Sequence, residues 1–264
     1  MGNILNKAVV IKIGGSTLGA HDTTIQDVVT LQKRGVPLVI VHGGGKVITD
    51  WLKKQGISTA FVRGQRVTDK ASLEVVVAVL AGLVNKEITA AVNKAGGKAV
   101  GISGVDGALL QSDIKDPELG YVGEVTKINL KLLEDLLSAS YVPVVAPIGF
   151  YSSGKQGESP MMLNINADGV AGDIAEVVGA EKLVFLTDVE GVLDGAGKLM
   201  SKLSIDDAKS LVAAGVASGG MIPKIEACLK AVSGASVTSI IDGRQPNALI
   251  RLIDGDIRGT TINS

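Results

Sequence analysis

Two lysines stand where a positive charge needs an anion beside it. Lys12 is one residue before the end of the apolar run 8–13, and an ammonium buried in a sheet costs free energy unless it meets an opposite charge. Lys224 would stand in the first turn of a helix over residues 224–232, where the helix dipole is already positive. For Lys12, a structural alternative is a side chain that reaches out of an edge strand. An anionic ligand would satisfy both positions.

Glycine clusters adjoin both lysines. Gly14-Gly15 follows Lys12, and Gly219-Gly220 precedes Lys224. A third cluster, His42-Gly43-Gly44-Gly45, joins the apolar run 37–41 to a segment with helical spacing. Backbone N–H groups of a glycine turn that leads into a helix bind anions. The glycines therefore predict the same chemistry as the lysines.

The histidine-glycine motif also forms the oxyanion hole of some esterases, which makes a hydrolase an alternative. That chemistry needs Gly-x-Ser-x-Gly, which occurs nowhere in the sequence, and a second suitable histidine, where His21 is the only other one. The phosphate-binding-loop and dinucleotide motifs are absent too. The sequence thus disfavours a hydrolase, a P-loop enzyme and a dinucleotide binder.

A polar cluster occupies residues 164–169. Asn164 and Asn166 are predicted to share one side of an extended segment, and Asp168 stands at or near the start of a helix. Asp168 could be a plain helix N-cap, or it could face the lysines.

The elements that position these residues are short Val- and Ile-rich runs that alternate with helical segments, which predicts a parallel sheet covered on both faces. The fold class is α/β, a three-layer αβα sandwich with a mainly parallel central sheet and two lobes that meet near residue 173. Residues 107–126 and 149–164 are polar and turn-rich, which predicts β-hairpins at the mouth of the site. The runs expected as strands are 8–13, 37–41, 99–102, 142–148, 183–186 and 237–241.

Composition excludes several classes of protein. The 264 residues carry a net charge of −1 and are 46% hydrophobic, so the chain is neither disordered nor a basic nucleic-acid binder. The single Cys228 excludes an internal disulfide and a cysteine metal cluster. The first residues lack a signal-peptide pattern, and the longest apolar run, 75–84, is shorter than the roughly 20 residues of a membrane span. A cytoplasmic protein with no membrane partner is expected.

Residues 69–95 predict one long helix, capped by Thr68 or Asp69. Its middle is apolar on all sides, so it is either a central core helix or a helix that a second subunit covers in a homodimer.

Taken in order, the clusters resemble the amino-acid kinase family and, within it, the members that phosphorylate N-acetyl-L-glutamate. The resemblance runs from Lys12 to about Gly259. It rests on six motifs: Lys12-Ile13-Gly14-Gly15, His42-Gly43-Gly44-Gly45, Gly64-Gln65-Arg66-Val67-Thr68-Asp69, Asn164-Ile165-Asn166-Ala167-Asp168, Thr187-Asp188-Val189-Glu190-Gly191-Val192 and Gly219-Gly220-Met221-Ile222-Pro223-Lys224.

The resemblance implies transfer of phosphate from ATP to the γ-carboxylate of N-acetyl-L-glutamate, a step of arginine biosynthesis. It implies that Lys12 and Lys224 contact the transferring phosphoryl group, while Asp168 orients both lysines. The implied substrate-binding residues are Gly44, Gly45, Arg66, Asn164 and Asn166, with Arg66 as a two-pronged clamp on the α-carboxylate. The implied ATP and phosphate residues are Gly14, Gly15, Asp188, Val189, Glu190, Gly191, Val192, Leu193, Val216, Ala217, Ser218, Gly219 and Gly220. An N lobe over residues 1–173 would hold the amino acid and the dimer interface, and a C lobe over residues 174–264 would hold ATP.

The chemistry is consistent with this division. A carboxylate is already ionised at neutral pH, so no general base is needed, and Mg²⁺ would arrive with ATP rather than in a protein metal site. Alternatives in the same family are kinases of acetylaminoadipate, aspartate, UMP or carbamate; an alternative of another class is a ligand sensor without catalysis. The resemblance implies that arginine-inhibited members usually carry an extra N-terminal helix, which joins dimers into a hexamer. Because only eleven residues precede Lys12, too few for that helix, we expect a homodimer insensitive to arginine. The sequence says nothing about a signalling-protein partner.

Overall fold

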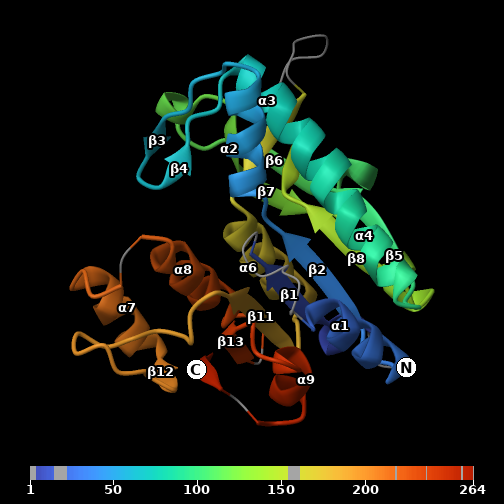
Figure 1. Cartoon of the computed structure of the whole chain (residues 1–264), viewed down its shortest axis with the longest axis vertical. Helices are drawn as coiled ribbons and strands as arrows, with labels where there is room; N and C mark the ends of the chain where they lie inside the picture. Colours follow the sequence, from blue (N-terminus) through green and yellow to red (C-terminus); the bar gives the residue numbers. More distant parts are fainter. Residues whose placement is uncertain are drawn as a thin grey trace.

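The computed structural model describes residues 4–14, 23–153, 161–217, 219–235, 237–256 and 258–263. Its centre is an eight-stranded sheet in the order β12-β14-β13-β11-β1-β2-β8-β5, in which only the pair β13 and β14 is antiparallel (Figure 1). The strands are β1 (Val9–Ile13), β2 (Leu38–His42), β5 (Ala99–Ser103), β8 (Val142–Ala146), β11 (Lys182–Thr187), β12 (Lys202–Ser204), β13 (Val237–Asp242) and β14 (Gly259–Asn263). The predicted α/β class is confirmed. Because β1 lies inside the sheet, Lys12 is not on an edge strand.

Helices cover both faces of this sheet. Along β1, the side chains of Val9, Ile11 and Ile13 join one buried core and that of Val10 joins the other, as the two-residue period of a strand requires. The first core is completed by α1 (Thr24–Lys33), α2 (Gly45–Lys54), α3 (Lys70–Val77), α4 (Asn85–Lys94) and α9 (Ala248–Ile253). The second is completed by α5 (Lys131–Ser138), α6 (Ala167–Val178), α7 (Ile205–Ala213) and α8 (Met221–Ala231). These are the three layers expected from the sequence.

A smaller sheet stands above the carboxyl ends of the central strands. It closes on itself in the order β10-β7-β6-β9, from β6 (Leu110–Ile114), β7 (Val122–Ile128), β9 (Ile148–Tyr151) and β10 (Met162–Ile165). Both predicted hairpin regions contribute to it. The run 142–148, expected as one strand, is divided between β8 and β9 in different sheets, with Pro147 between them. A separate hairpin, β3 (Phe61–Val62) with β4 (Gln65–Arg66), was not expected as an element.

Single-turn helical segments complete the described chain: η1 (Ile4–Lys7), η3 (Asp106–Ala108) and η4 (Pro117–Leu119).

The long helix expected over residues 69–95 is present, with an irregular middle. Asp69 caps it by accepting a hydrogen bond from the Ser72 N–H at 2.8 Å. Between α3 and α4 the segment η2 (Ala78–Val84) is a π-helix, which the spacing of apolar residues did not predict. Figure 1 shows the three segments as one continuous rod beside β5 and β8.

One helix among the described residues, Lys70–Lys94, is long and apolar enough to cross a membrane by length and composition, with a hydropathy of 1.8 over an 18-residue window. The 18-residue window averages over polar residues as well, whereas the unbroken apolar run 75–84 has only ten residues. In the structure 44% of that window is buried inside the protein, and core helices of soluble proteins pass the same test. Leu73, Val76 and Ile88 belong to the core shared with α1 and α2.

Candidate active site

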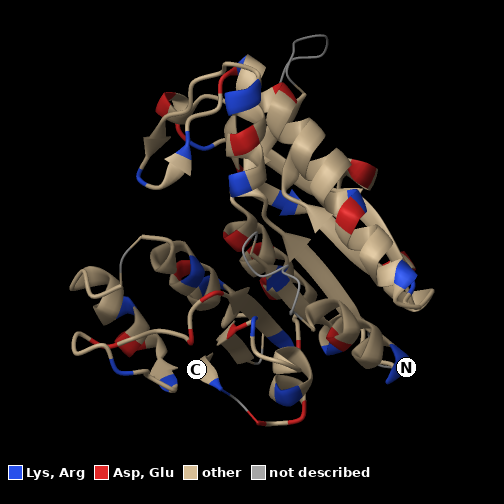
Figure 2. Cartoon of the chain, viewed as in Figure 1, with Lys and Arg blue, Asp and Glu red and all other residues tan. Residues whose placement is uncertain are grey.

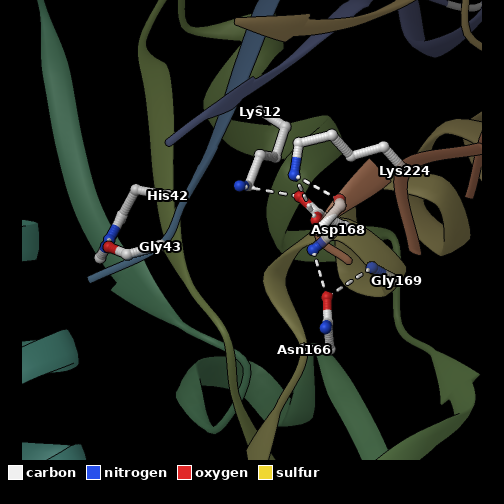
Figure 3. Close-up of polar contacts among 8 residues, drawn as sticks. Lys12, His42, Gly43, Asn166, Asp168, Gly169 and Lys224 are labelled. Atoms are coloured by element: carbon white, nitrogen blue, oxygen red, sulfur yellow. Dashed lines mark hydrogen bonds and ion pairs between the residues drawn. The ribbon is translucent and has the colours of Figure 1, made fainter. Parts of the chain in front are cut away.

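Asp168 joins the two lysines that the sequence singled out. One carboxylate oxygen lies 2.8 Å from Lys12 Nζ and the other 3.0 Å from Lys224 Nζ (Figure 3). Lys12 and Asp168 are 7% and 6% exposed, so this is a buried cluster. Lys224 Nζ also donates to the Gly220 carbonyl at 3.1 Å. The structure therefore brings together the three residues predicted as catalytic.

The local fold explains why Asp168 is available to both lysines. Asn166 is the N-cap of α6, and its side-chain oxygen accepts from the N–H groups of Asp168 (2.8 Å) and Gly169 (3.3 Å). The alternative in which Asp168 is the N-cap is wrong. Asn166, predicted as a substrate ligand, lines the cavity described below, but its side-chain oxygen is committed to the cap.

Lys224 reaches Asp168 because α8 packs closely on α6. A Cβ atom at Gly172 of α6 would lie 2.9 Å from the Ala227 carbonyl of α8, so only glycine permits this approach. The helix α8 begins at Met221, three residues before the predicted start. Lys224 is still in its first turn, where Asp168 supplies the negative charge that offsets the helix dipole.

The electrostatics keep Asp168 ionised. Burial alone would raise the pKa of this carboxyl group, but Lys12 and Lys224 outweigh burial and hold the pKa below its usual value. One carboxylate between two ammonium groups leaves a net charge of +1. The cluster therefore attracts an anion while its own charges are partly compensated.

A cavity of about 230 Å³ opens beside the cluster. Its lining residues that the sequence predicted are Lys12, Gly44, Gly45, Arg66, Asn164, Asn166 and Asp168. The size suits a small organic acid, and every member of the predicted amino-acid site is present.

Arg66 supplies a second positive charge to the cavity. Its Nη2 donates to Thr49 Oγ1 at 2.7 Å and to the Gly45 carbonyl at 3.2 Å, while Phe61 stacks on the guanidinium with 4.7 Å to the ring centroid. The buried Nη1 has no hydrogen-bond partner in the described part of the chain. Burial lowers the pKa of Arg66 from its usual value, but a guanidinium stays charged at neutral pH. A carboxylate is the natural partner for that free donor.

The glycine turn lies on the wall of the cavity between these charges. Gly43 N–H donates to the Ile13 carbonyl at 3.1 Å, whereas the N–H groups of Gly44 and Gly45 have no partner among the residues described. A Cβ atom at Gly44 would lie 2.7 Å from Leu80 Cδ2, so a side chain does not fit there. Asn164 also lines the cavity and donates to Thr68 Oγ1 at 3.1 Å.

The predicted ATP residues are not in this cavity. Asp188, Val189, Glu190 and Leu193 follow β11 and are exposed, as are Val216, Gly219 and Gly220 near the start of α8, while Gly14 is half-buried. Gly15 and Ser218 lie outside the described residues.

Three of the predicted ATP residues have buried side chains or backbone. Val192 is part of the core, and its N–H donates to Thr260 Oγ1 at 2.8 Å. A Cβ atom at Gly191 would lie 2.6 Å from Thr260 Oγ1, so the backbone of Gly191 packs closely on Thr260. Ala217 is 6% exposed. That these three residues line the ATP site stays a prediction.

Sequence reasoning missed Thr49, Phe61 and Asn85. Thr49 and Phe61 hold Arg66, and they come from α2 and β3, elements that only the folded chain brings together. Asn85 is fully buried against His42. The one signal for it was an amide at the end of an apolar stretch. For metals, no group of three or more His, Cys, Asp or Glu among the described residues could hold an ion.

Comparison with known proteins agrees with this geometry. Residues 7–242 match the amino acid kinase family. Acetylglutamate kinase of Dehalococcoides mccartyi (strain ATCC BAA-2100 / JCM 16839 / KCTC 5957 / BAV1) is 48% identical over 257 residues, covering 97% of this chain and 94% of that protein. Acetylglutamate kinase of Cereibacter sphaeroides (strain KD131 / KCTC 12085) is 45% identical over 261 residues, covering 97% and 87%.

Solved structures agree with the fold. N-acetylglutamate synthase from Neisseria gonorrhoeae, complexed with coenzyme A and N-acetyl-glutamate, superposes with a TM-score of 0.83 at 26% identity, over 98% of this chain and 60% of that one. Carbamate kinase from Giardia lamblia bound to AMP-PNP superposes with a TM-score of 0.70 at 15% identity, over 98% of both chains, which speaks for the fold alone. With a family match over most of its length and relatives at nearly half identity, this chain belongs to the amino acid kinase family.

Proposed function

We propose that the chain is an acetylglutamate kinase, which transfers the γ-phosphoryl group of ATP to the γ-carboxylate of N-acetyl-L-glutamate. The observation that carries this is the cavity with Arg66 on its wall and the Lys12-Asp168-Lys224 cluster beside it. A dicarboxylic acid fits such a site because one carboxylate can meet Arg66 while the other meets the cluster. The relatives named acetylglutamate kinase support the same substrate.

The proposed reaction needs charge compensation rather than proton transfer. A carboxylate oxygen forms a bond to the γ-phosphorus, the bond from that phosphorus to the ADP oxygen breaks, and ADP leaves with the electron pair. Both reactants are anions, so the barrier is repulsion, and fixed ammonium groups and backbone N–H groups lower it. Lys12 and Lys224 would meet the transferring phosphoryl group, and the free N–H groups of Gly44 and Gly45 would meet the acceptor. Mg²⁺ would arrive with ATP, coordinated by its phosphates.

The ATP site in this proposal lies on the C lobe, residues 174–264. Gly14 and Asp188 follow β1 and β11, adjacent parallel strands whose carboxyl ends share one edge of the sheet, where ligands of such sheets bind. The exposed Gly219 and Gly220 directly precede α8, whose N-terminus favours phosphate. The N lobe, residues 1–173, would hold the amino acid.

A panel of acceptors tests the substrate. The purified protein is given ATP and Mg²⁺ with N-acetyl-L-glutamate, N-acetyl-L-aspartate, L-aspartate, UMP or carbamate, and ADP release is followed together with trapping of acyl phosphate by hydroxylamine. We expect N-acetyl-L-glutamate to give the highest kcat/KM and a hydroxamate. Discrimination against an acceptor one methylene different is worth about 1–3 kcal/mol. ADP release with UMP or carbamate alone would contradict the proposal, as would no turnover of any acceptor.

Assembly as a homodimer is part of the proposal. Figure 2 shows the middle of the long helix without charged residues, and Val77, Ala81 and Leu83 on it are only partly buried in one chain. A second copy would cover this face, which fits the N lobe as dimer interface. Sedimentation with and without arginine tests the state: a dimer in both is expected, and a hexamer contradicts it. The reaction is placed in the cytoplasm, as a step of arginine biosynthesis.

A further inference from the structure

The last residue of β2, His42, is buried beside the glycine turn and contacts both that turn and the long helix. Its Nδ1 lies 2.9 Å from the Gly43 carbonyl oxygen, and its Nε2 lies 3.2 Å from Asn85 Nδ2, at the first residue of α4. His42 is 1% exposed and Asn85 is completely buried. Figure 3 shows His42 and Gly43 on the far side of Lys12 from Asp168, so this contact is separate from the cluster of charges.

The orientation of the Asn85 side chain follows from its other partners. Its Nδ2 also donates to the Val144 carbonyl at 2.8 Å and to the Ile102 carbonyl at 3.1 Å, on β8 and β5. Carbonyl oxygens accept only, so the NH₂ end must face them and His42. Lys86 Nζ donates to Asn85 Oδ1 at 3.0 Å at the opposite end of the amide.

The sequence provides the space for this amide. A Cβ atom at Gly101 would lie 2.1 Å from Asn85 Oδ1 and 2.5 Å from Thr89 Oγ1, so the strand β5 has glycine where the asparagine enters.

These contacts determine the state of the imidazole ring. Burial is the main cause that lowers the pKa of His42 to about 4, and nearby Lys12 and Lys86 also lower it, so the ring is neutral near pH 7. A neutral ring has one N–H. Because the Gly43 oxygen can only accept, the proton is on Nδ1, and Nε2 is an acceptor that faces the Asn85 NH₂ group, whose two protons are shared among Nε2 and the two carbonyl oxygens.

The ring therefore controls the peptide between Gly43 and Gly44. A trans peptide is planar, and its C=O and N–H point in opposite directions. Holding the Gly43 oxygen toward the ring thus directs the Gly44 N–H away from it. His42 lies on the same sheet face as Ile40, and Lys12 on the opposite face with Val10. The Gly44 N–H is therefore turned away from the His42 ring, and Gly44 lies on the wall of the cavity.

We infer that His42 and Asn85 are positioning residues for phosphoryl transfer: the pair holds the Gly43-Gly44 peptide so that the Gly44 N–H faces the anionic acceptor. The inference rests on the proposed function of the glycine turn. Neither His42 nor Asn85 lines the cavity that would hold the substrate. The pair acts through a backbone donor whose value depends on its direction, because a preorganised donor stabilises the transition state only when it already faces the developing charge.

A matched pair of asparagines on α4 separates positioning from stability. Asn85→Leu removes the amide that holds the ring, whereas Asn93→Leu removes an amide of the same helix that bonds Ala99 of the same strand and does not touch His42. We expect Asn85→Leu to lower kcat for N-acetyl-L-glutamate by about 10-fold or more, a fraction of the ~10²-fold loss of a whole donor, with KM for ATP unchanged. Asn93→Leu should lower Tm and leave kcat near that of the unmodified enzyme. Equal kcat values for the two variants would overturn the inference.

Substitution of the ring tests the same idea from its other side. His42→Asn keeps an N–H donor near the Nδ1 position and should recover much of the kcat that His42→Leu loses. No difference between these two variants would overturn the inference.

Nitrogen-15 NMR of the unmodified protein gives a readout independent of turnover and of variant folding. We expect His42 to carry its proton on Nδ1, and the Gly44 amide resonance to shift when N-acetyl-L-glutamate is added. A proton on Nε2, or a Gly44 amide resonance that does not shift when N-acetyl-L-glutamate is added, would overturn the inference. Binding that shifts Gly44 in a protein that transfers no phosphate would refute the proposed function and leave standing only that the pair directs the Gly44 N–H toward a bound anion.

Discussion

Replacement of Asp168 by asparagine tests the charge cluster most directly. The substitution keeps the size of the side chain and removes the negative charge that lies 2.8 Å from Lys12 Nζ and 3.0 Å from Lys224 Nζ. Both lysines keep their charge, but they repel each other and lose the group that holds them in place. Loss of one oriented donor costs about 10²–10³ in kcat, so we expect a fall of at least ~10²-fold, which is about 2.7 kcal/mol of barrier.

Asp168→Asn should also lower the free energy of unfolding, by less than the loss of one partner of a fully enclosed ion pair would. Removing one partner of a buried pair costs roughly 3–5 kcal/mol. The cavity beside the cluster gives water access to the stranded ammonium groups, so we expect the lower end, about 3 kcal/mol. Because the folded pKa of Asp168 is lowered, this contribution is fully present above its unfolded value of 3.8 and is lost as pH falls through the folded pKa. Assays at pH 7.5 therefore measure the whole effect.

Asp173 offers a matched control on the same helix. It is 8% exposed, pairs with Lys230 of α8 as Asp168 pairs with Lys224, and does not line the cavity that holds Asp168. Burial is the main cause that raises the pKa of Asp173, so its negative charge stabilises the folded state less than that of Asp168 does. Asp173→Asn should leave kcat within about twofold. The assay is kcat and KM from hydroxamate formation, with unfolding in urea measured alongside. The reasoning is refuted if Asp168→Asn keeps kcat within threefold, or if both variants lose activity equally.

Three further outcomes are expected. Lys12→Ala and Lys224→Ala should each lower kcat by roughly 10²-fold or more while ATP binding, measured by calorimetry, changes little; near-normal turnover would remove that lysine from the chemistry. In the unmodified protein Arg66 bonds Thr49 through Nη2 and keeps Nη1 for a ligand. Arg66→Lys keeps the charge but loses this two-pronged group, so the main effect should be a higher KM for the amino acid, and an unchanged KM would exclude the clamp. Since the pKa of His42 falls from 6.5 unfolded to about 4 folded, the unfolded chain binds a proton that the folded chain does not, and wild-type stability should drop as pH falls from 6.5 toward 4, by up to about 3 kcal/mol. His42→Asn should abolish most of that drop in urea melts at pH 7 and 4.5; parallel curves would contradict it.

The sequence was most informative where one residue conflicts with its own element. Lys12 in an apolar strand and Lys224 in the first turn of a helix are each unfavourable alone, so each predicts an unseen partner, and Asp168 is that partner. The strands of the central sheet were predictable for a related reason, since runs buried on both faces have no polar alternation. The division of residues 142–148 between two sheets was not, because both halves are equally apolar.

Contacts between residues far apart in the sequence could not be predicted where each residue suits its own local element. Thr49 and Phe61 suit a helix and a hairpin, and only the folded chain shows that both hold Arg66. The loop after β11 shows what a consecutive motif leaves open. The consecutive motif predicted that residues 188–193 line the ATP site, and within that segment the chain turns at Gly191 so that the Val192 side chain lies in the core. Motifs locate a segment, whereas the direction of each side chain depends on packing.

The division of labour between Asn166 and Asp168 shows how the fold accommodates a buried carboxylate. If Asp168 were the N-cap of α6, backbone N–H groups would occupy its oxygens, and Lys12 would lie in the sheet without a counter-charge. Asn166 takes the cap instead, with a neutral oxygen that accepts from Asp168 and Gly169. Asp168 then stands in the first turn, where the helix dipole favours its charge and both of its oxygens remain free for the lysines. One helix start thus satisfies its own backbone and supplies the anion that Lys12 and Lys224 need, and this explains why an asparagine and an aspartate two residues apart have different partners in one site.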